Sequence, residues 1–176
     1  MCAKGIDKYI TRHREELTGE HAFGDAGQLI LFIAFMAVWI TDSFIFKYST
    51  LLNDYIPFYS LRLWLAIIVL IVASYMAWTG MKIVFGTVHE KPHVIRNGVF
   101  GVVRHPIYIS EILLYLGLLL LNTSLATAGV WFIGIVFLHF ISRYEEKVLL
   151  EHFGDEYRRY MNDVPMYFPR IFRKKR

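Results

Sequence analysis

The chain has 176 residues, 56% of them hydrophobic and 16% aromatic, which excludes an ordinary soluble domain. Charged residues make up only 19%, and the net charge of +4 comes mainly from a basic tail, so no nucleic-acid surface is expected. The single cysteine, Cys2, excludes an internal disulfide framework and a cysteine-based zinc site. These features predict one integral membrane domain over residues 1–176.

The first 27 residues are polar, with four basic and five acidic side chains. Because they contain no apolar core, we do not expect a cleavable signal peptide. Apolar side chains from Ile6 to Leu17 recur at roughly helical spacing, which favours a short amphipathic helix lying on the membrane. A solvated helical terminus is an equally good interpretation of the same residues.

Four apolar segments follow. A helix of about 20 residues crosses the roughly 30 Å hydrocarbon core. The expected transmembrane helices are 28–46, 60–85, 106–121 and 125–142. Pro106 suits the first turn of the third helix, where its missing N–H costs nothing. The fourth helix is expected to continue through Tyr160 as an amphipathic segment, with or without a break at Gly154. The chain then divides into an N-terminal segment (1–27), a two-helix hairpin (28–85) and a second half (86–176).

Lysine and arginine counts predict the orientation of these helices. The 82–104 region has four basic residues and the tail from Arg143 has nine, whereas the turn at 122–124 has none. The positive-inside rule therefore places both termini and the 86–105 loop in the cytoplasm. The polar cluster Arg104-His105 and the cluster Glu145-Glu146 then share the cytoplasmic face.

His89-Glu90-Lys91-Pro92-His93 matches a zinc-protease pattern letter by letter. That pattern binds zinc only on a continuous helix, which places the two imidazoles one turn apart. Pro92 disfavours such a helix, and no third ligand follows. We therefore predict no metal site.

Glu111 lies inside the third apolar segment, on the same face as Tyr108 and Tyr115. An intramembrane carboxylate is a candidate functional residue. The alternative is that Glu111 only bonds a polar partner, such as Tyr75 or His139, within the bundle.

Arg104-His105-Pro106 stands where a polar loop enters the third helix. Pro106 holds His105 in an extended conformation, and the helix N-terminus that follows suits a carboxylate or phosphate. Glu145 and Glu146 supply the opposite charge, suited to an ammonium or to hydroxyls. The clusters form either one ligand pocket or a structural salt bridge between two helices.

These residues belong to a longer ordered pattern that resembles a known family. The pattern consists of Val94-Ile95-x-x-Gly98-Val99-Phe100, Arg104-His105-Pro106-x-Tyr108, Glu145-Glu146-x-x-Leu149 and Phe153-Gly154-Asp155-Glu156-Tyr157-x-x-Tyr160. Over residues 86–170 the chain resembles the isoprenylcysteine carboxyl methyltransferases, with the phospholipid N-methyltransferases as related enzymes.

The resemblance implies an S-adenosylmethionine-dependent membrane methyltransferase. It implies an all-α fold whose cytoplasmic C-terminal helical segment closes a cofactor pocket, and a lipidic or prenylated acceptor that reaches this pocket from the bilayer. By position, the cofactor would contact Val94, Ile95, Phe100, Arg104, His105, Pro106, Ile107, Tyr108, Glu145 and Glu146.

The acceptor and the catalytic groups are less defined by this resemblance. Where prenylcysteine enzymes carry a substrate-orienting arginine, this chain has Ile141, and Arg143 two residues later is the candidate replacement. The acceptor group is a carboxylate, an amine or a thiol, methylated by direct in-line displacement. A carboxylate needs no base, whereas an amine must first lose a proton, with Glu111 or His139 as candidate bases. We expect the acceptor to pass between the third and fourth helices. Small residues there, such as Gly117 and Gly134, either leave room for its chain or only permit close helix packing, which is their more common role.

Two other classes of protein remain as alternatives. One is a membrane reductase related to the sterol reductases and using a nicotinamide cofactor, although the chain has no G-x-G-x-x-G motif. The other is a non-enzymatic membrane protein whose polar clusters only hold helices together.

Overall fold

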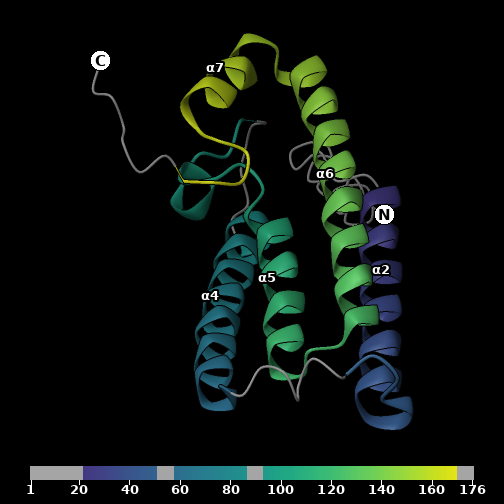
Figure 1. The fold of residues 1–176 in the computed structure, drawn as a ribbon. Helices are drawn as coiled ribbons and strands as arrows, with labels where there is room; N and C mark the ends of the chain where they lie inside the picture. The colour runs from purple at the N-terminus through teal and green to yellow at the C-terminus, as the bar shows by residue number, and fades with distance from the viewer. Residues whose placement is uncertain (1–21, 51–57, 87–92, 170–176) are drawn as a thin grey trace, which may run out of the picture.

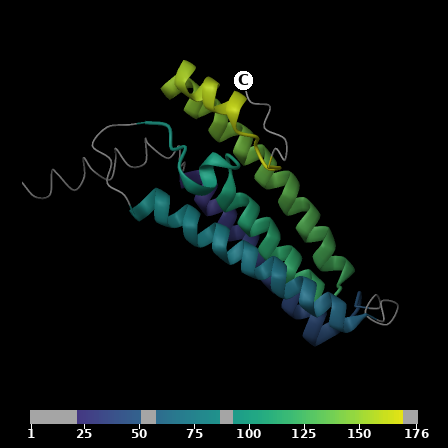
Figure 2. The ribbon, with the colours of Figure 1, turned by 90° about the vertical axis from the view of Figure 1, so that its left-hand side faces the viewer.

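The computed structural model describes residues 22–50, 58–86 and 93–169, and all regular elements in these ranges are helical. The long helices run alongside one another, with the short helix α7 at one end of the bundle (Figures 1 and 2). The expected amphipathic helix over 6–17, together with His89 and Glu90, lies outside the described residues.

The first long helix, α2 (Ala22–Ile40), continues into a π-helical segment, η1 (Thr41–Phe46). It begins at Ala22 and not at residue 28, because residues 22–27 contain no proline to stop a helix from extending past the apolar run. The Thr41 hydroxyl donates to the Ala37 carbonyl (2.7 Å), a local bond that competes with regular helical pairing. Lys47 then ends the segment in the left-handed conformation, with φ 54°.

The second long helix, α4 (Tyr59–Gly86), packs most extensively against α5 (Pro106–Leu121), whose bounds are those expected from the sequence. Gly117 permits this close approach, because a Cβ there would lie 2.6 Å from the Leu70 side chain. Pro106 occupies the first turn of α5, where its ring fits helical geometry.

The third long helix, α6 (Leu125–Phe153), pairs with α2, so the bundle consists of the pairs α4–α5 and α2–α6 (Figure 1). Buried side chains join the two pairs. Phe35 of α2 stacks on Tyr115 of α5 at 4.1 Å between ring centroids. The indole of Trp39 donates to the Leu118 carbonyl at 3.1 Å.

At the end of the bundle opposite α7, a cluster of polar side chains connects η1 with the N-terminus of α6. The buried Asp42 carboxylate accepts a hydrogen bond from the Ser49 backbone N–H (3.2 Å) and from the hydroxyls of Ser49 and Ser124. Ser124 also caps α6 by accepting from the Thr127 N–H at 3.0 Å. This cluster therefore fastens the end of the first span to the turn between α5 and α6.

Three segments are long and apolar enough to cross a membrane: Ala26–Phe46, Tyr59–Gly86 and Leu125–Phe153. The 16 residues of α5 rise only about 24 Å, less than the hydrocarbon core. The chain is therefore a multi-pass membrane protein with three candidate spans, and the fourth span stays a prediction.

The chain reverses direction beyond the membrane segment of α6. Gly154 takes a positive φ of 53°, which glycine adopts without steric cost, and this residue separates α6 from α7 (Asp155–Asp163). Of the two forms expected for the C-terminal amphipathic segment, the structure has the broken one. Residues 164–169, which we call the C-terminal strap, then return toward the start of α5.

Candidate functional site

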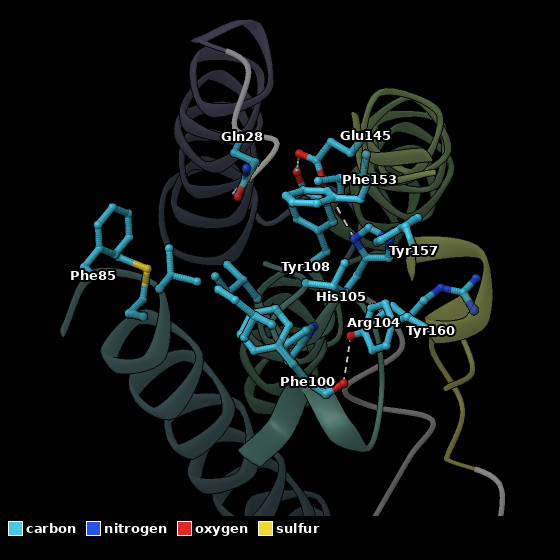
Figure 3. Close-up of a pocket in the computed structure, with 17 residues that line it drawn as sticks. Gln28, Phe85, Phe100, Arg104, His105, Tyr108, Glu145, Phe153, Tyr157 and Tyr160 are labelled. Carbon is cyan, nitrogen blue, oxygen red and sulfur yellow. Dashed lines mark hydrogen bonds and ion pairs between the residues drawn. The ribbon is translucent and has the colours of Figure 1, made fainter. Parts of the chain in front are cut away.

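A cavity of about 350 Å³ lies at the α7 end of the bundle, where the start of α5 faces α6 and α7. Its polar side chains gather around the α5 N-terminus, whereas Phe85 of α4 lies on the other side (Figure 3). Met81 and Val84 of the same helix also line the cavity, so α4 supplies an apolar wall, and Gln28 of α2 is a further lining residue. The cavity thus joins a charged end to an apolar end.

The loop that carries Arg104 and His105 is held by the C-terminal strap. The Arg104 backbone N–H donates to the Pro165 carbonyl (3.0 Å), and the His105 N–H donates to the Met166 carbonyl (3.4 Å). Tyr160 adds a third connection by donating its hydroxyl to the Phe100 carbonyl at 2.7 Å, as Figure 3 shows. One wall of the cavity therefore depends on residues about sixty positions later in the chain.

The Arg104 side chain donates its hydrogen bonds to other residues of the protein. Its Nε donates to Oε1 of Glu146 (2.7 Å), and its Nη1 donates to the carbonyls of Met161 (2.9 Å) and Val164 (2.5 Å). The two side chains of the ion pair are only 8% and 3% exposed. Arg104 therefore acts chiefly by holding the loop, α6 and the strap together, although it also lines the cavity.

His105 lies between the two glutamates of α6. Its Nε2 is 3.3 Å from Oε1 of Glu146, and its Nδ1 is 3.7 Å from Oε2 of Glu145. The imidazole stacks on the Tyr108 ring, with 5.5 Å between centroids and 9° between planes. The Tyr108 hydroxyl donates to Oε1 of Glu145, so a connected polar group faces the cavity (Figure 3).

Burial lowers the pKa of His105 below its ordinary value, and the charge of Arg104 acts in the same direction. Glu146 opposes this shift through its hydrogen bond and its charge. The neutral imidazole is therefore the favoured form near pH 7.

Nine of the ten residues matched to cofactor contacts line the cavity: Val94, Ile95, Phe100, Arg104, His105, Pro106, Ile107, Tyr108 and Glu145. The tenth, Glu146, lies behind His105 and is buried.

The two candidate catalytic residues do not line the cavity. The Arg143 side chain is 62% exposed, with its Nη1 3.7 Å from Oε2 of Glu146. Glu111 accepts a hydrogen bond from the hydroxyl of Tyr115, one turn along α5. His139, the other candidate base, is exposed and also stands outside the cavity. Their catalytic roles stay predictions.

The cavity is also lined by residues for which no role was predicted: Gln28, Met81, Val84, Phe85, Leu149, Phe153, Tyr157 and Tyr160. The last four belong to the matched pattern, so their presence in it was the available signal. The α4 residues and Gln28 carried no signal, because they lie within long apolar segments whose side chains look alike in sequence.

Of the two interpretations of Gly117 and Gly134, the structure has close packing and not room for an acceptor chain. Gly117 faces Leu70 of α4, and a Cβ on Gly134 would lie 3.3 Å from Leu31 of α2. Both glycines allow close helix packing, the usual role of small residues between membrane helices. The apolar part of the cavity is instead bounded by α4.

The family model described as "Phospholipid methyltransferase" matches residues 55–156, more than half of the chain. The matched range contains α4, α5, Arg104-His105 and both glutamates of α6. No curated protein and no solved structure matches the chain. The match favours a methyltransferase over the reductase and the non-enzymatic alternatives. The chain belongs to the phospholipid methyltransferase family, membrane enzymes of the same superfamily as the isoprenylcysteine carboxyl methyltransferases.

Proposed function

We propose that the protein transfers a methyl group from S-adenosylmethionine to the amine of a phospholipid head group. The observation that carries the proposal is the cavity, which joins the charged surroundings of His105 to an apolar wall on α4. A lipid head group and a polar cofactor need these two environments side by side.

The residues around the cavity fit the chemistry of the cofactor. The first N–H groups of α5 and the positive end of its dipole suit a carboxylate. Glu145 suits an ammonium or ribose hydroxyls. The aromatic rings of Phe100, Tyr157 and Tyr160 suit the flat face of an adenine. S-adenosylmethionine, when bound, would supply an electrophilic methyl group on its sulfonium.

The apolar wall supports a lipid acceptor. Met81, Val84 and Phe85 come from the last turns of a candidate membrane span, so an acceptor in the bilayer reaches the cavity without leaving an apolar environment. Among common head-group atoms, phosphate diester oxygens are weak nucleophiles, whereas a neutral amine nitrogen is a strong one. This difference favours an amine-bearing phospholipid.

Positioning supplies much of the expected rate. Holding two reactants in line is worth about 7–11 kcal/mol in well-oriented systems. The strap and Arg104 serve this purpose by fixing the loop at one side of the cavity. The transfer needs neither a metal nor a covalent intermediate on the protein.

Two measurements test the proposal. Isothermal titration of the purified protein should show binding of S-adenosylhomocysteine and not of NADPH. Labelled methyl should pass to phosphatidylethanolamine in nanodiscs, and not to phosphatidylcholine, whose nitrogen has no free electron pair. Preferential NADPH binding, or equal labelling of a water-soluble amine without lipid, would contradict it.

A pair of matched variants tests whether this cavity is the cofactor site. Glu145→Gln should weaken S-adenosylhomocysteine binding by ten- to a hundredfold, because a hydrogen bond to a charged group contributes about 1.5–3 kcal/mol. His139→Gln, on the same helix but outside the cavity, should bind normally. Equal effects of the two substitutions would contradict the assignment of this cavity.

A further inference from the structure

An amine acceptor is protonated at neutral pH, and the cofactor does not remove its proton. An alkyl amine has an ordinary pKa of about 10.4, so near pH 7 it is an ammonium with no electron pair to donate. A base must remove a proton before methyl transfer. The predicted bases Glu111 and His139 stand outside the cavity, so the base must be sought among the lining residues.

The geometry around His105 resembles that of a base with an orienting carboxylate. The side chain is 7% exposed and does not cap α5, although His105 precedes the helix. Glu146, held in place by Arg104, approaches Nε2 at 3.3 Å. An Nε2–H that donates to this carboxylate leaves the Nδ1 electron pair on the side of Glu145, which lines the cavity.

We propose that His105 is the catalytic base, with Glu146 as its positioning residue; this inference rests on the proposed function. Nδ1 forms a bond to a proton of the acceptor ammonium as that N–H bond breaks, and the acceptor nitrogen keeps the electron pair. The imidazolium that forms lies between Glu145 and Glu146, which compensate its charge. The proton later returns to water.

Glu145 is the competing base, and its chemistry makes it the weaker candidate. Its Oε1 already accepts from the Tyr108 hydroxyl. A carboxylate has an ordinary pKa of about 4.3, further from that of an ammonium than the ordinary imidazole value of about 6.5, although burial narrows this difference by lowering the pKa of His105. The engaged Oε1 of Glu145 and its proposed contact with the cofactor ammonium therefore leave His105 as the stronger candidate.

The pH dependence of His105 is set by groups on every side of it. Burial lowers its pKa, so the imidazole is neutral and able to accept a proton near pH 7. The titratable and charged groups that face it are Arg104 of its own loop, Tyr108 of α5, His139, Glu145 and Glu146 of α6, and Tyr167 of the strap.

The first test is the pH profile of methylation in nanodiscs that contain phosphatidylethanolamine, at saturating cofactor. In the wild-type protein, kcat/KM should be nearly independent of pH above about 7. His105→Gln should lose about 10²- to 10⁴-fold at pH 7, the usual contribution of a general base. Its remaining rate should rise about tenfold per pH unit toward pH 9, because only the small neutral fraction of the amine then reacts. His139→Gln is the control and should keep the wild-type rate above pH 7; only its acid limb should move slightly to higher pH, because His139 lowers the pKa of His105.

The second test does not use activity. Nitrogen-15 NMR of histidine-labelled protein should show His105 neutral at pH 7, with Nε2 protonated and Nδ1 unprotonated; the signal missing from His105→Gln assigns the resonance. Glu146→Gln retains an oxygen that accepts from Arg104 but loses the charge. It should therefore leave S-adenosylhomocysteine affinity within about threefold, lower kcat at least tenfold and shift the acid limb of the profile.

Three results would overturn the inference. The first is an unchanged pH profile in active His105→Gln protein, and the second is the opposite tautomer in the NMR spectrum. Both would leave the proposed function standing. The third, a wild-type protein that binds S-adenosylhomocysteine but methylates no amine lipid at any pH, would remove the proposed acceptor and the base together.

Discussion

Replacing Arg104 with alanine tests whether the charged center of the site holds the fold together. The substitution leaves the buried Glu146 carboxylate with only His105 Nε2 at 3.3 Å and the distant Arg143 at 3.7 Å. Breaking a buried ion pair from one side typically costs about 3–5 kcal/mol, because the remaining charge stays buried. Glu146→Ala should lower the free energy of unfolding by less, since the Arg104 guanidinium keeps its hydrogen bonds to the carbonyls of Met161 and Val164.

Unfolding by SDS in mixed micelles, followed by tryptophan fluorescence, measures these differences. The double variant Arg104→Ala/Glu146→Ala should be more stable than the sum of the single effects predicts, by about 0.5–3 kcal/mol for residues in direct contact. Arg158→Ala is the control, because its pair with Asp155 is 67% and 85% exposed and should contribute at most about 1 kcal/mol. Equal costs for Arg104→Ala and Arg158→Ala, or additive effects in the double variant, would refute this reasoning.

Three further predictions concern the bundle. Gly117→Ala should cost about 1–3 kcal/mol in the same unfolding assay, because its Cβ would lie 2.6 Å from an α4 side chain. Gly129→Ala, with nothing within 4 Å, should not destabilise the fold. Asp42→Ala should destabilise by about 1–3 kcal/mol, because the Ser49 and Ser124 hydroxyls and the Ser49 N–H lose their shared acceptor, with unchanged S-adenosylhomocysteine affinity in calorimetry. Single cysteines at the exposed positions Leu125 and Asp155 should label from opposite sides of the membrane, Asp155 from the cytoplasm; labelling from one side would contradict the topology.

The helix positions were predictable because apolar length and helix-end residues are local signals. The bounds of α5 follow from Pro106 at one end and the polar turn at 122–124 at the other. The predicted start of α2 lies six residues too late, because residues such as Gly24, Asp25 and Gly27 continue the helix without continuing its apolar run. The break at Gly154 stayed open in sequence, because a glycine permits a positive φ without requiring it.

The site was predictable on its charged side and not on its apolar side. Three residues stand out, Arg104, His105 and Glu145, because charged and imidazole groups near a bilayer are energetically costly unless they line a cavity or pair with other groups. Met81 and Phe85 are ordinary members of an apolar helix, and only the packing of α4 on α5 turns them toward the cavity. The role of Gly117 stayed open for the same reason, since the sequence does not distinguish a space between helices from a contact.

The contacts of Arg104 span long distances along the chain, and this has a consequence for synthesis in the cell. Its partners lie 42 residues downstream at Glu146, 57 at Met161 and 60 at Val164. At about 5–20 residues per second, a ribosome needs roughly 3–12 seconds to add the last of them after Arg104. During that interval α4 is already made and α5 is added first, while α7 and the strap, which hold the wall of the cavity, are added last. Cofactor binding should therefore begin only late in translation, and ribosome-bound chains that stop before Val164 should insert into membranes without being able to retain S-adenosylhomocysteine.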